Sequence, residues 1–477
     1  MNLFRLLSLS VCCITAYPLH VQAIAPEIAK PIENALKRKC LAKNNTAVHI
    51  VSVPEGKTVF EKNANKPLLP ASTMKIVTSA AALHYLGPEY RFKTKILHTG
   101  PQVNGEIKGD LIIQGGGDPK LRSADLREIS ARLKSAGIWR VTGDLVADDT
   151  FFDGLDRAPS WKEKRSRYRY DAGLSALSLN FNSVDVHVKP GKRRGSKVVA
   201  WLNPAPAYMK IINAAETGKR RSRNTIWADR KEQGDALNIV LRGRLPQSVG
   251  ERMLFLNVKN PTRYAAESFR SILQETGIEI LGKTVIAATP ENVAQIHEHH
   301  SPPLSLILKE LNTYSNNFVA EQVLKTMAAH QTNSTGTHAN GLSLMKQFLQ
   351  LSGVDLKNVE LADASGLSRQ NRLTAKTLTH LLAAMPGRFD IGPDFMAALR
   401  VMGADGISSK RFKNSPARGQ VRAKTGSLNG VSTLAGYVPG KDGGLYAYAL
   451  FLTQNRCGHH IADRVEDRIV NAIHTGK

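Results

Sequence analysis

The chain has 477 residues, of which 65 are Lys or Arg and 40 are Asp or Glu, so its formal net charge is +25. This charge excludes an acidic protein and leaves nucleic acid, an anionic envelope surface and an anionic substrate open as partners, while a hydrophobic share of 42% with 22% charged residues excludes a disordered polyelectrolyte. Four cysteines without a C-x-x-C pair are too few for a disulfide scaffold and argue against a thiolate zinc site.

The first 23 residues are typical of a secretory signal peptide. A basic start at Arg5 precedes an apolar run over 6–17, and small or neutral residues lead to a cleavage point after Ala23. The alternative is a membrane anchor, but the run is shorter than the roughly 20 residues that a membrane span needs. We therefore expect an exported chain without a transmembrane anchor. Two cysteines remain in it, Cys40 and Cys457, either as one disulfide or as buried thiols.

The start of the mature chain combines helical and strand patterns. Apolar positions at helical spacing predict a helix over 26–39, and two short runs predict strands over 47–53 and 58–61 that are joined by a turn. Pro70 then opens a second helix with an apolar face, and a Gly-Pro pair at 87–88 ends it.

From Tyr90 to Thr289 short alternating stretches are separated by Gly- and Pro-rich turns. This texture predicts a β-rich insert with two nested subdomains, the inner one over about 165–245. Residues 157–231 contain 18 Lys or Arg against 5 Asp or Glu. These basic runs have few aromatic residues, so weak contact with an anionic envelope surface, or solubility alone, is a better interpretation than nucleic acid. Strands are expected over 92–97, 109–114, 141–147, 184–188, 197–201 and 237–241.

Helical patterns return after Pro303, and the chain closes with three strands and a last helix. The expected helices are 304–311, 317–329, 341–351, 375–384, 395–399 and 460–473, and the expected strands are 419–424, 432–438 and 445–452. An antiparallel sheet built from both ends of the chain, with helices between, unifies these elements. We therefore expect residues 24–89 and 290–477 to form one domain that is interrupted by the insert over 90–289.

The first candidate motif is S-x-x-K, which occurs at Ser72–Lys75 and at Ser343–Lys346. Only Ser72 starts an apolar helix, where residues i and i+3 share a face and backbone N–H groups point at the serine. The positive end of that helix also favours the neutral form of Lys75, which a general base needs. Ser343 lies inside a predicted helix without such surroundings.

The second and third motifs lie in the C-terminal half. S-x-N occurs four times, and only Ser315–Asn317 lies between two predicted helices of the helix-rich part; its alternative role is an N-cap. K-T-G occurs once, over 424–426, at the end of a predicted strand. A strand edge offers N–H and C=O groups to an extended peptide, Gly426 permits close approach, and Lys424 is suited to holding a carboxylate.

The order S-x-x-K, S-x-N, K-T-G resembles the signature of the penicillin-recognising serine acyltransferases. The 240 positions from Lys75 to Ser315 narrow the resemblance to the D-Ala-D-Ala carboxypeptidase/endopeptidase family, the class C low-molecular-mass penicillin-binding proteins. Further similar stretches are 115–119, 147–152, 314–317, 363–369, 424–428 and 434–437. One departure is Ala364, where the family more often has glycine.

The resemblance implies an α/β (α+β) transpeptidase fold like that of penicillin-binding proteins and serine β-lactamases. An antiparallel five-stranded sheet is flanked by helices, and the β-rich insert lies between the S-x-x-K helix and the S-x-N loop. In that fold the strand after Cys40 and the strand before Cys457 are antiparallel neighbours. The two cysteines are therefore expected to form a disulfide.

The resemblance also implies catalytic roles. Ser72 attacks the carbonyl between two D-alanines and forms an acyl-enzyme, while Lys75 takes its proton. Ser315 and Asn317 carry the proton toward the leaving amine and orient the peptide. Water then releases the acyl group, and the family uses no metal or organic cofactor.

Substrate binding is implied for the K-T-G stretch. Lys424 and Thr425 hold the terminal carboxylate, Gly426 lets the peptide approach, and the N–H group of Ser427 forms the oxyanion hole with that of Ser72.

Two further residues correspond by position to family residues that hold the diamino acid of the stem peptide. These are Asp148 in the insert and Arg369 in the S-G-L-S-R stretch. The alternatives are a turn residue for Asp148 and a surface ion pair for Arg369. The run His-Glu-His-His at 297–300 resembles a metal cluster, but a solvated linker is the better interpretation, so no metal is expected.

The expected function is a periplasmic serine-type D-Ala-D-Ala carboxypeptidase that also acts as an endopeptidase. Its substrates would be peptidoglycan stem peptides and cross-links, and β-lactam antibiotics would inhibit it covalently. The alternatives are a serine β-lactamase and a non-catalytic peptidoglycan-binding protein.

Overall fold

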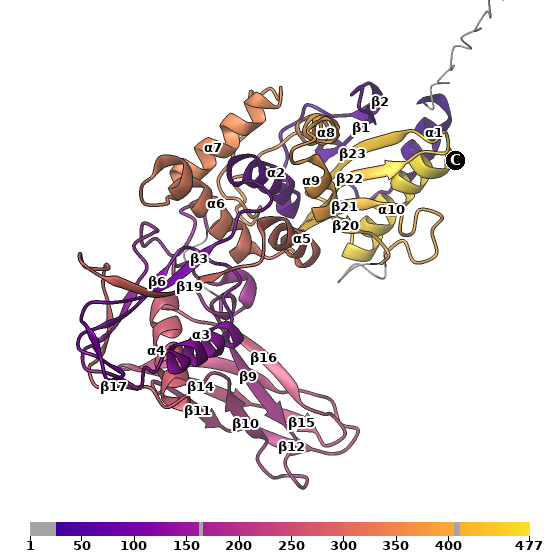
Figure 1. The fold of residues 1–477 in the computed structure, drawn as a ribbon. Coiled ribbons are helices and arrows are strands. Elements are labelled where there is room, and N and C mark those ends of the chain that lie inside the picture. Colours follow the sequence, from indigo (N-terminus) through magenta and orange to yellow (C-terminus); the bar gives the residue numbers. More distant parts are fainter. Residues whose placement is uncertain (1–24, 162–165, 405–410) are drawn as a thin grey trace, which may run out of the picture.

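The structure is a computed structural model, which describes residues 25–161, 166–404 and 411–477 (Figure 1). The expected signal peptide over residues 1–23 lies outside these ranges. Among the described residues, we find no helix with the length and hydropathy that crossing a membrane requires.

A six-stranded antiparallel sheet joins the two ends of the chain. Its order is β2-β1-β23-β22-β21-β20. The strands are β1 (Thr46–Val53), β2 (Thr58–Lys62), β20 (Arg400–Val401), β21 (Arg422–Leu428), β22 (Val431–Pro439) and β23 (Leu445–Thr453). The five expected strands are all present, and the two-residue β20 adds a sixth at the edge. The K-T-G residues lie inside β21, whereas the sequence pattern placed them at the end of a strand.

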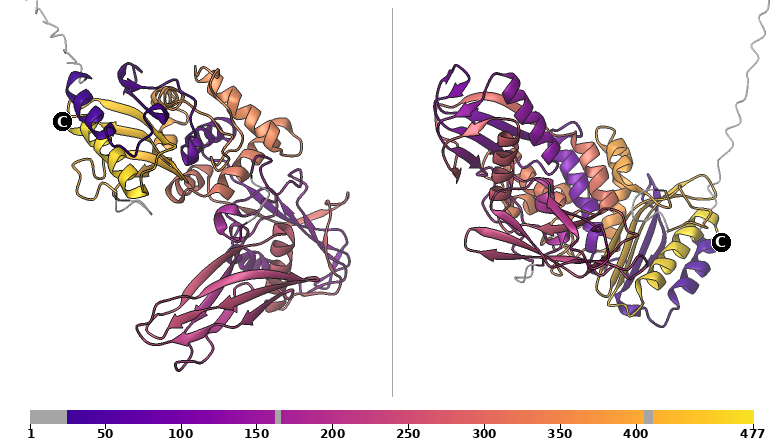
Figure 2. Two further views of the ribbon diagram at one scale, coloured as in Figure 1. Left: turned by 180° about the vertical axis from the view of Figure 1, so that it is seen from behind. Right: turned by 90° about the horizontal axis from the view of Figure 1, so that it is seen from below.

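Helices cover both faces of this sheet, and its central strands β1, β22 and β23 are therefore buried on both faces. Side chains of Val48 and Ile50 in β1 pack in one cluster with α1 (Ala25–Leu36) and α10 (His459–Thr475). Ala47 and Val51, which alternate with them, pack instead in the cluster that contains α2 and α8. Figures 1 and 2 show α1 and α10 side by side on the outer face of the sheet.

The disulfide expected between Cys40 and Cys457 is confirmed. The Cα atoms of the two cysteines are 5.1 Å apart, and the bond joins residues 417 positions apart in sequence. Strands β1 and β23 are paired along their full length, from Thr46 opposite Leu452, which brings the start of one beside the end of the other. The N–H group of Arg456 also donates to the Cys40 carbonyl at 2.9 Å.

This link predicts a large change in stability when it is removed. Replacing both Cys40 and Cys457 by serine should lower the free energy of unfolding by about 2–5 kcal/mol, because the cross-link restricts the unfolded chain over a very long loop. Urea unfolding of the purified protein measures the change, and peptide mapping without reductant should recover the two cysteines as one linked pair. Two freely alkylated thiols in the native protein would contradict the assignment.

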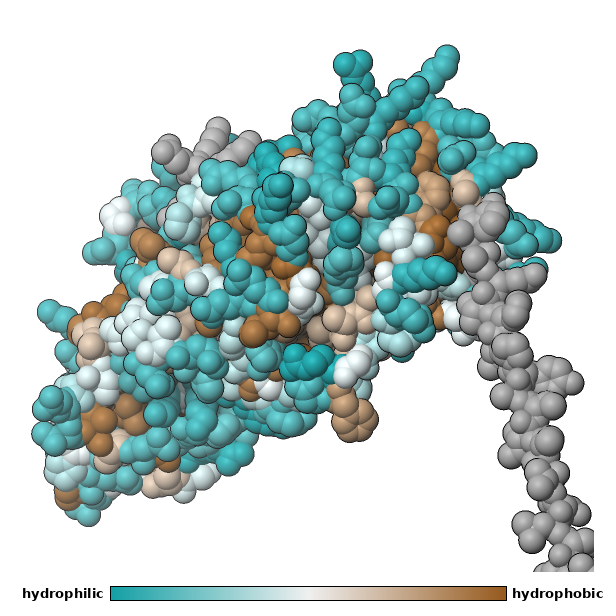
Figure 3. Space-filling view, turned by 90° about the horizontal axis from the view of Figure 1, so that it is seen from above, coloured by the Kyte–Doolittle hydropathy of each residue, from teal (hydrophilic) through white to brown (hydrophobic). Residues whose placement is uncertain are grey.

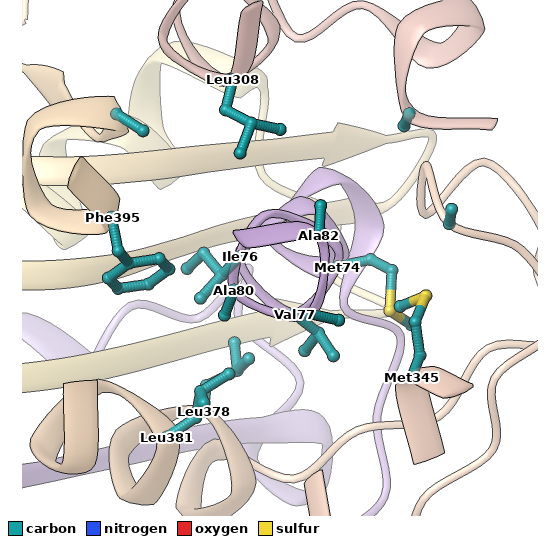
Figure 4. Close-up of a cluster of buried hydrophobic side chains, with 14 of the residues drawn as sticks. Met74, Ile76, Val77, Ala80, Ala82, Leu308, Met345, Leu378, Leu381 and Phe395 are labelled. Carbon is teal, nitrogen blue, oxygen red and sulfur yellow. The ribbon is translucent and has the colours of Figure 1, made fainter. Parts of the chain in front are cut away.

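Helix α2 (Met74–Leu86) lies at the centre of the catalytic half. It is apolar on nearly all sides, as a helix surrounded by other elements must be. Figure 4 shows Ile76 on the side of α2 that faces Phe395, and Met74 on another side, next to Met345. Gly87, at φ 80°, ends the helix in a conformation that favours glycine. The start of α2, which carries the S-x-x-K motif, is thus fixed by core packing.

The remaining helices of this half surround α2. They are α5 (Leu304–Tyr314), α6 (Asn317–Thr332), α7 (His338–Leu351), α8 (Ala375–Ala384) and α9 (Gly392–Ala398). Each corresponds to an expected helix, with ends that differ by a few residues. Only Ser315 and Asn316 separate α5 from α6, and Asn317, the first residue of α6, contacts Lys75 near the start of α2.

The insert contains several small sheets. The group nearest the helices comprises β3 (Lys93–His98), β4 (Gln102–Val103), β5 (Glu106–Ile107), β6 (Leu111–Gly115), β7 (Arg140–Val141), β8 (Leu145–Asp148), β17 (Glu279–Ile280), β18 (Thr284–Ile286) and β19 (Ala294–His300). The other comprises β9 (Ser183–Lys189), β10 (Val199–Leu202), β11 (Met209–Asn213), β12 (Glu216–Gly218), β13 (Trp227–Gln233), β14 (Ala236–Arg242), β15 (Arg244–Pro246) and β16 (Arg252–Asn257). Figure 1 shows β12 and β15 at the end of the molecule far from the central sheet.

Three features of the insert differ from the sequence-based prediction. It contains two helices that the β-rich prediction did not include, α3 (Ser123–Ser135) and α4 (Pro261–Glu275). Strand β19 pairs with β3, so the sheet of the insert extends beyond the expected boundary at Thr289. The His-Glu-His-His run belongs to β19 and is therefore a strand, because its backbone completes that sheet; the linker interpretation was wrong.

Hydrophilic side chains dominate the surface of the molecule seen from above, with hydrophobic side chains in small groups between them (Figure 3). This is the surface expected of a chain with a formal charge of +25, because a large net charge favours solubility.

Candidate active site

The candidate nucleophile Ser72 lies in a tight turn at the start of α2. The turn spans Ala71–Thr73, and Ala71 has φ 46°, a left-handed conformation that is costly for a residue with a side chain. Gly366 packs directly against this turn, since a Cβ atom there would lie 1.8 Å from the carbonyl oxygen of Ala71. The backbone around Ser72 is therefore held in a strained conformation by its neighbours, as functional sites often are.

Lys75 lies one helical turn from Ser72 and is completely buried. Its Nζ donates to Ser72 Oγ at 3.0 Å, to Asn317 Oδ1 at 2.8 Å and to the Ser365 carbonyl. Burial lowers the pKa of Lys75 to about 8, although Asp363 and Glu321 act in the opposite direction. A lysine with this pKa supplies an appreciable fraction of neutral amine near neutral pH, which is what a general base requires.

The S-x-N residues lie at the junction of α5 and α6. Ser315 has φ 56°, which ends α5 and turns the chain toward Lys424. The N-cap of α6 is the middle residue, Asn316, whose side chain accepts from Val319 N. The capping role is thus filled by a residue between the two motif positions, and Ser315 and Asn317 are left to face the site.

Lys424 is the second completely buried lysine. Its Nζ donates to Ser315 Oγ at 2.9 Å and to the Thr425 carbonyl at 2.7 Å. Burial, with help from the nearby cations Lys75 and Arg400, holds the pKa of Lys424 well below its usual range. A negatively charged group in the site would relieve this repulsion, so the site is suited to an anion.

Strand β21 packs closely against the turn of Ser72. A Cβ atom on Gly426 would lie 2.9 Å from Ser72 N and 2.2 Å from Thr433 Oγ1, so only glycine fits. Thr433, on the adjacent strand β22, donates to the Pro70 carbonyl at 2.8 Å and ties the hairpin to the turn. Thr425 is half-buried and Ser427 is exposed, which leaves this edge open to a ligand.

Two buried carboxylates near Lys75 were not predicted from the sequence. Glu321, on α6, accepts from the N–H groups of Ala364 and Ser365 at 3.1 and 2.9 Å. Asp363 accepts from Gly366 N at 2.7 Å and from other groups of the same loop. Together they fix the loop whose Ser365 carbonyl accepts from Lys75.

Arg400 on β20 is a further buried group that the motifs did not indicate. It is 1% exposed, and its guanidinium donates to the carbonyls of Asn312 and Thr313 at the end of α5. This contact joins β20 to the segment just before Ser315. The edge of the sheet and the S-x-N loop are thereby held together.

Two residues, Asp148 and Arg369, were expected to hold the diamino acid of the stem peptide. Of these, only Arg369 lies near the motifs. Arg369 is exposed, and its Nη2 donates to the Asn429 carbonyl at 2.7 Å, beside the end of β21. Asp148 instead lines a cavity of about 610 Å³ between the insert and the end of α6. Its carboxylate oxygens accept hydrogen bonds from Gln114, Thr150 and Thr289. Asp148 is the last residue of β8, and these contacts satisfy its carboxylate within the insert; its role in holding the diamino acid stays a prediction.

The second S-x-x-K pair has no comparable setting. Ser343 is exposed on α7, and Lys346 is half-buried one turn later.

Among the described residues, no group of three or more His, Cys, Asp or Glu side chains is arranged to hold a metal ion. The three motifs over 72–75, 315–317 and 424–426 are thus the ones that the fold brings together.

Residues 28–474 match the family described as D-Ala-D-Ala carboxypeptidase 3 (S13). The chain belongs to this family. It is 33% identical to a D-alanyl-D-alanine carboxypeptidase of an Actinomadura species over 88% of this chain and 80% of that protein. It is 28% identical to D-alanyl-D-alanine carboxypeptidase DacB of Haemophilus influenzae, over 92% of this chain and 91% of that one.

Solved structures agree with this assignment. The fold matches the crystal structure of penicillin binding protein 4 (dacB) from Haemophilus influenzae with a TM-score of 0.78 and 26% identity, over 92% of this chain and 97% of that chain. A predatory peptidoglycan endopeptidase from Bdellovibrio bacteriovorus matches with a TM-score of 0.51 and 17% identity, over 91% and 93%, which shows a shared fold alone. The expected serine-hydrolase family and its α+β penicillin-binding fold are thus confirmed.

Proposed function

We propose that this carboxypeptidase hydrolyses the D-Ala–D-Ala bond of peptidoglycan stem peptides through an acyl-enzyme on Ser72. The observation that carries the proposal is the continuous chain of hydrogen bonds from Ser72 through Lys75 to Asn317, beside a second buried lysine that contacts Ser315. This arrangement joins a nucleophile, a base and a proton donor in one site. The same site reacts with penicillin, whose strained amide presents a similar carbonyl.

Acylation begins with Lys75 in its neutral form. Lys75 removes the hydroxyl proton of Ser72, and the oxygen attacks the carbonyl carbon of the penultimate D-alanine. Negative charge develops on the carbonyl oxygen, and the N–H groups of Ser72 and Ser427 are suited to donate hydrogen bonds to it. Gly426 supports this assignment, because it packs closely against Ser72 N and places no side chain between the N–H groups of Ser72 and Ser427.

Departure of D-alanine requires a proton on its nitrogen. Ser315 Oγ accepts from Lys424, so its own hydroxyl hydrogen is free to be directed at the leaving amine. Ser315 is then without its proton. Lys75, which took the proton of Ser72, and Lys424 return a proton to Ser315 through this network. Asn317 holds Lys75 in position and, in this proposal, also orients the peptide.

The C-terminal carboxylate of the substrate is assigned to Lys424, Thr425 and the open edge of β21. A carboxylate here would offset the positive charges of the two lysines and Arg400, so substrate binding restores part of the energy lost by burying them. Arg369, at the rim beside Asn429, is proposed to contact the stem-peptide side chain.

A pair of assays tests this function against its alternatives. The protein should release D-alanine from an N-acyl tripeptide that ends in D-Ala-D-Ala, and it should retain a fluorescent penicillin through denaturing electrophoresis. A β-lactamase would release the label quickly, and a non-catalytic binding protein would take none. Retained label without release of D-alanine would contradict the carboxypeptidase assignment.

The pKa of Lys75 predicts the pH dependence of acylation. Below pH 8 Lys75 is mostly protonated and cannot accept the proton, so the rate should rise with pH as the neutral form appears. Between pH 7 and pH 9 the second-order rate constant for penicillin acylation should increase about tenfold, as expected for one group titrating near 8. Stopped-flow quenching of tryptophan fluorescence measures it, with circular dichroism at each pH as a control for folding. A flat profile over this range would exclude Lys75 as the base.

Export to the periplasm and action on cross-links remain parts of this proposal. The Cys40–Cys457 disulfide supports an oxidising compartment. The division into a catalytic domain of residues 24–89 and 290–477 around the insert is likewise proposed, with its second boundary moved to the end of β19. N-terminal sequencing of the exported protein should begin at Ile24.

A further inference from the structure

A large cavity lies between the S-x-N loop and the insert. Its volume is about 550 Å³. One wall contains Ser315 and Asn317, and the opposite wall comes from the insert. The lining includes Lys120, Arg122, Arg169, Phe181, Asp185 and Phe255. Cavities of this size hold drug-sized ligands, so this cavity is much larger than a single D-alanine requires.

Two arginines of this cavity are held in place by aromatic rings. The guanidinium of Arg122 lies 3.8 Å from the ring centroid of Phe181, and that of Arg169 lies 4.9 Å from the same centroid. Arg169 also lies 4.4 Å from the ring centroid of Phe255. Cation–π contacts fix the position of a guanidinium without using its N–H donors for another residue.

The N–H groups of these two guanidiniums are therefore available to a ligand in the cavity. Within the described part of the chain, neither Arg122 nor Arg169 has a side-chain hydrogen bond or ion pair, and the Nε of Arg169 is buried without a partner. Lys120, by contrast, is paired with Glu310. Asp185, the remaining carboxylate of the cavity, has one oxygen buried without a partner. The cavity thus presents guanidinium groups whose natural ligand is a carboxylate.

The rest of the lining suits a methylene chain. Ile307, Leu311 and Val319 from α5 and α6 face the cavity together with the two phenylalanine rings. A ligand with an aliphatic chain that ends in a carboxylate would match both kinds of wall.

We propose that this cavity is a leaving-side subsite, which binds the second, carboxylate-bearing peptide of a peptidoglycan cross-link. The inference rests on the proposed function, because Ser315 marks the leaving side only if it delivers the proton to the leaving amine. In simple carboxypeptidase action the leaving group is one D-alanine and the subsite stays unused. In cleavage of a cross-link, the leaving amine belongs to a longer acidic peptide, which the two arginines hold.

Two small substrates test the subsite. They share an acyl side that ends in D-alanine and differ only in the leaving residue, which is D-alanine or D-2-aminopimelate, whose second carboxylate lies at the end of a longer methylene chain. The readout is the ratio of kcat/KM for the acidic leaving residue to kcat/KM for D-alanine, measured by release of the free amino acid. This ratio does not depend on the fraction of enzyme that is folded.

Variants that remove positive charge from the cavity and a variant that removes negative charge from it make the test specific. Replacing both arginines, Arg122→Gln with Arg169→Gln, should lower the ratio about tenfold, the loss expected for a charge-assisted hydrogen bond. Asp185→Asn should raise the ratio, because it removes a negative charge that repels the ligand. Arg244→Gln, on an exposed arginine of β15, is the matched control and should leave the ratio unchanged.

The outcomes separate this inference from the proposed function. An unchanged ratio in the double variant, or a lower ratio in Asp185→Asn, would overturn the subsite while leaving carboxypeptidase activity established. Failure of the wild-type protein to release D-alanine or to bind penicillin at Ser72 would instead overturn the function itself. Cleavage of a purified cross-linked muropeptide dimer should be lowered in the double variant as much as cleavage of the substrate with the D-2-aminopimelate leaving residue.

Discussion

Replacing Ser72 with alanine should abolish covalent penicillin labelling and reduce D-alanine release by about 10⁴-fold or more, as loss of the nucleophile does in serine hydrolases. Ser72 is a small, half-buried side chain in a turn that is fixed by Gly366 and by strand β21. Its hydroxyl accepts one hydrogen bond, from Lys75. Removal of that oxygen should therefore leave the fold intact, which thermal unfolding can check.

The matched control for this variant is Ser343→Ala. Ser343 belongs to the other S-x-x-K sequence, is exposed on α7, and should be dispensable for labelling. If Ser72→Ala still labels and Ser343→Ala does not, the nucleophile has been assigned to the wrong helix.

Replacing Lys75 with methionine should lower the rate of acylation by about 10³-fold, the size of a general-base contribution. Methionine is similar in length and apolar, so it fills the buried space that the lysine occupies. The hydroxyl of Ser72 would lose its proton acceptor, while the turn around it keeps its packing. Kinetics of penicillin acylation measure the loss.

Lys346→Met is the corresponding control. It changes the same residue type in the second S-x-x-K sequence, one helical turn after an exposed serine. Its acylation rate should equal that of the unchanged protein. A Lys75→Met variant that acylated at the same rate as this control would show that another group serves as the base.

The main site could be predicted from sequence because each motif sits in a local setting that its residues specify. Ser72 precedes an apolar helix, Ser315 lies between two helices, and Lys424 belongs to a strand that is followed by two more. Those settings depend on short-range patterns of polarity, which the sequence displays directly. Their convergence in space required the family resemblance, which the structure bears out.

The supporting groups could not be found in the same way. Glu321, Asp363 and Arg400 are separated from the motifs or carry no spacing signal, and their importance arises from burial and from hydrogen bonds across different elements. A charged residue in a helix is usually exposed. Its burial beside another charge depends on tertiary packing, which periodicity does not report.

The two helices of the insert had signals that were overlooked. In α4, Asn260 accepts from Arg263 N as an N-cap, and Pro261 occupies the first turn, a common start for a helix. In α3, Leu126, Ile129 and Leu133 are spaced for one helical face. The surrounding short strands made the whole segment resemble a β-rich region. The hydrogen bonds to Asp148 could not be predicted either, because position in a similar stretch does not reveal how many donors surround a carboxylate.

The most direct test of the acyl-enzyme assignment is mass spectrometry of the protein after reaction with benzylpenicillin. We expect one penicilloyl group per chain, and proteolysis should locate it on the peptide that contains Ser72. The adduct should be absent from Ser72→Ala and present in Ser343→Ala. An adduct on any other residue, or an unmodified protein that has hydrolysed no penicillin, would contradict the central claim.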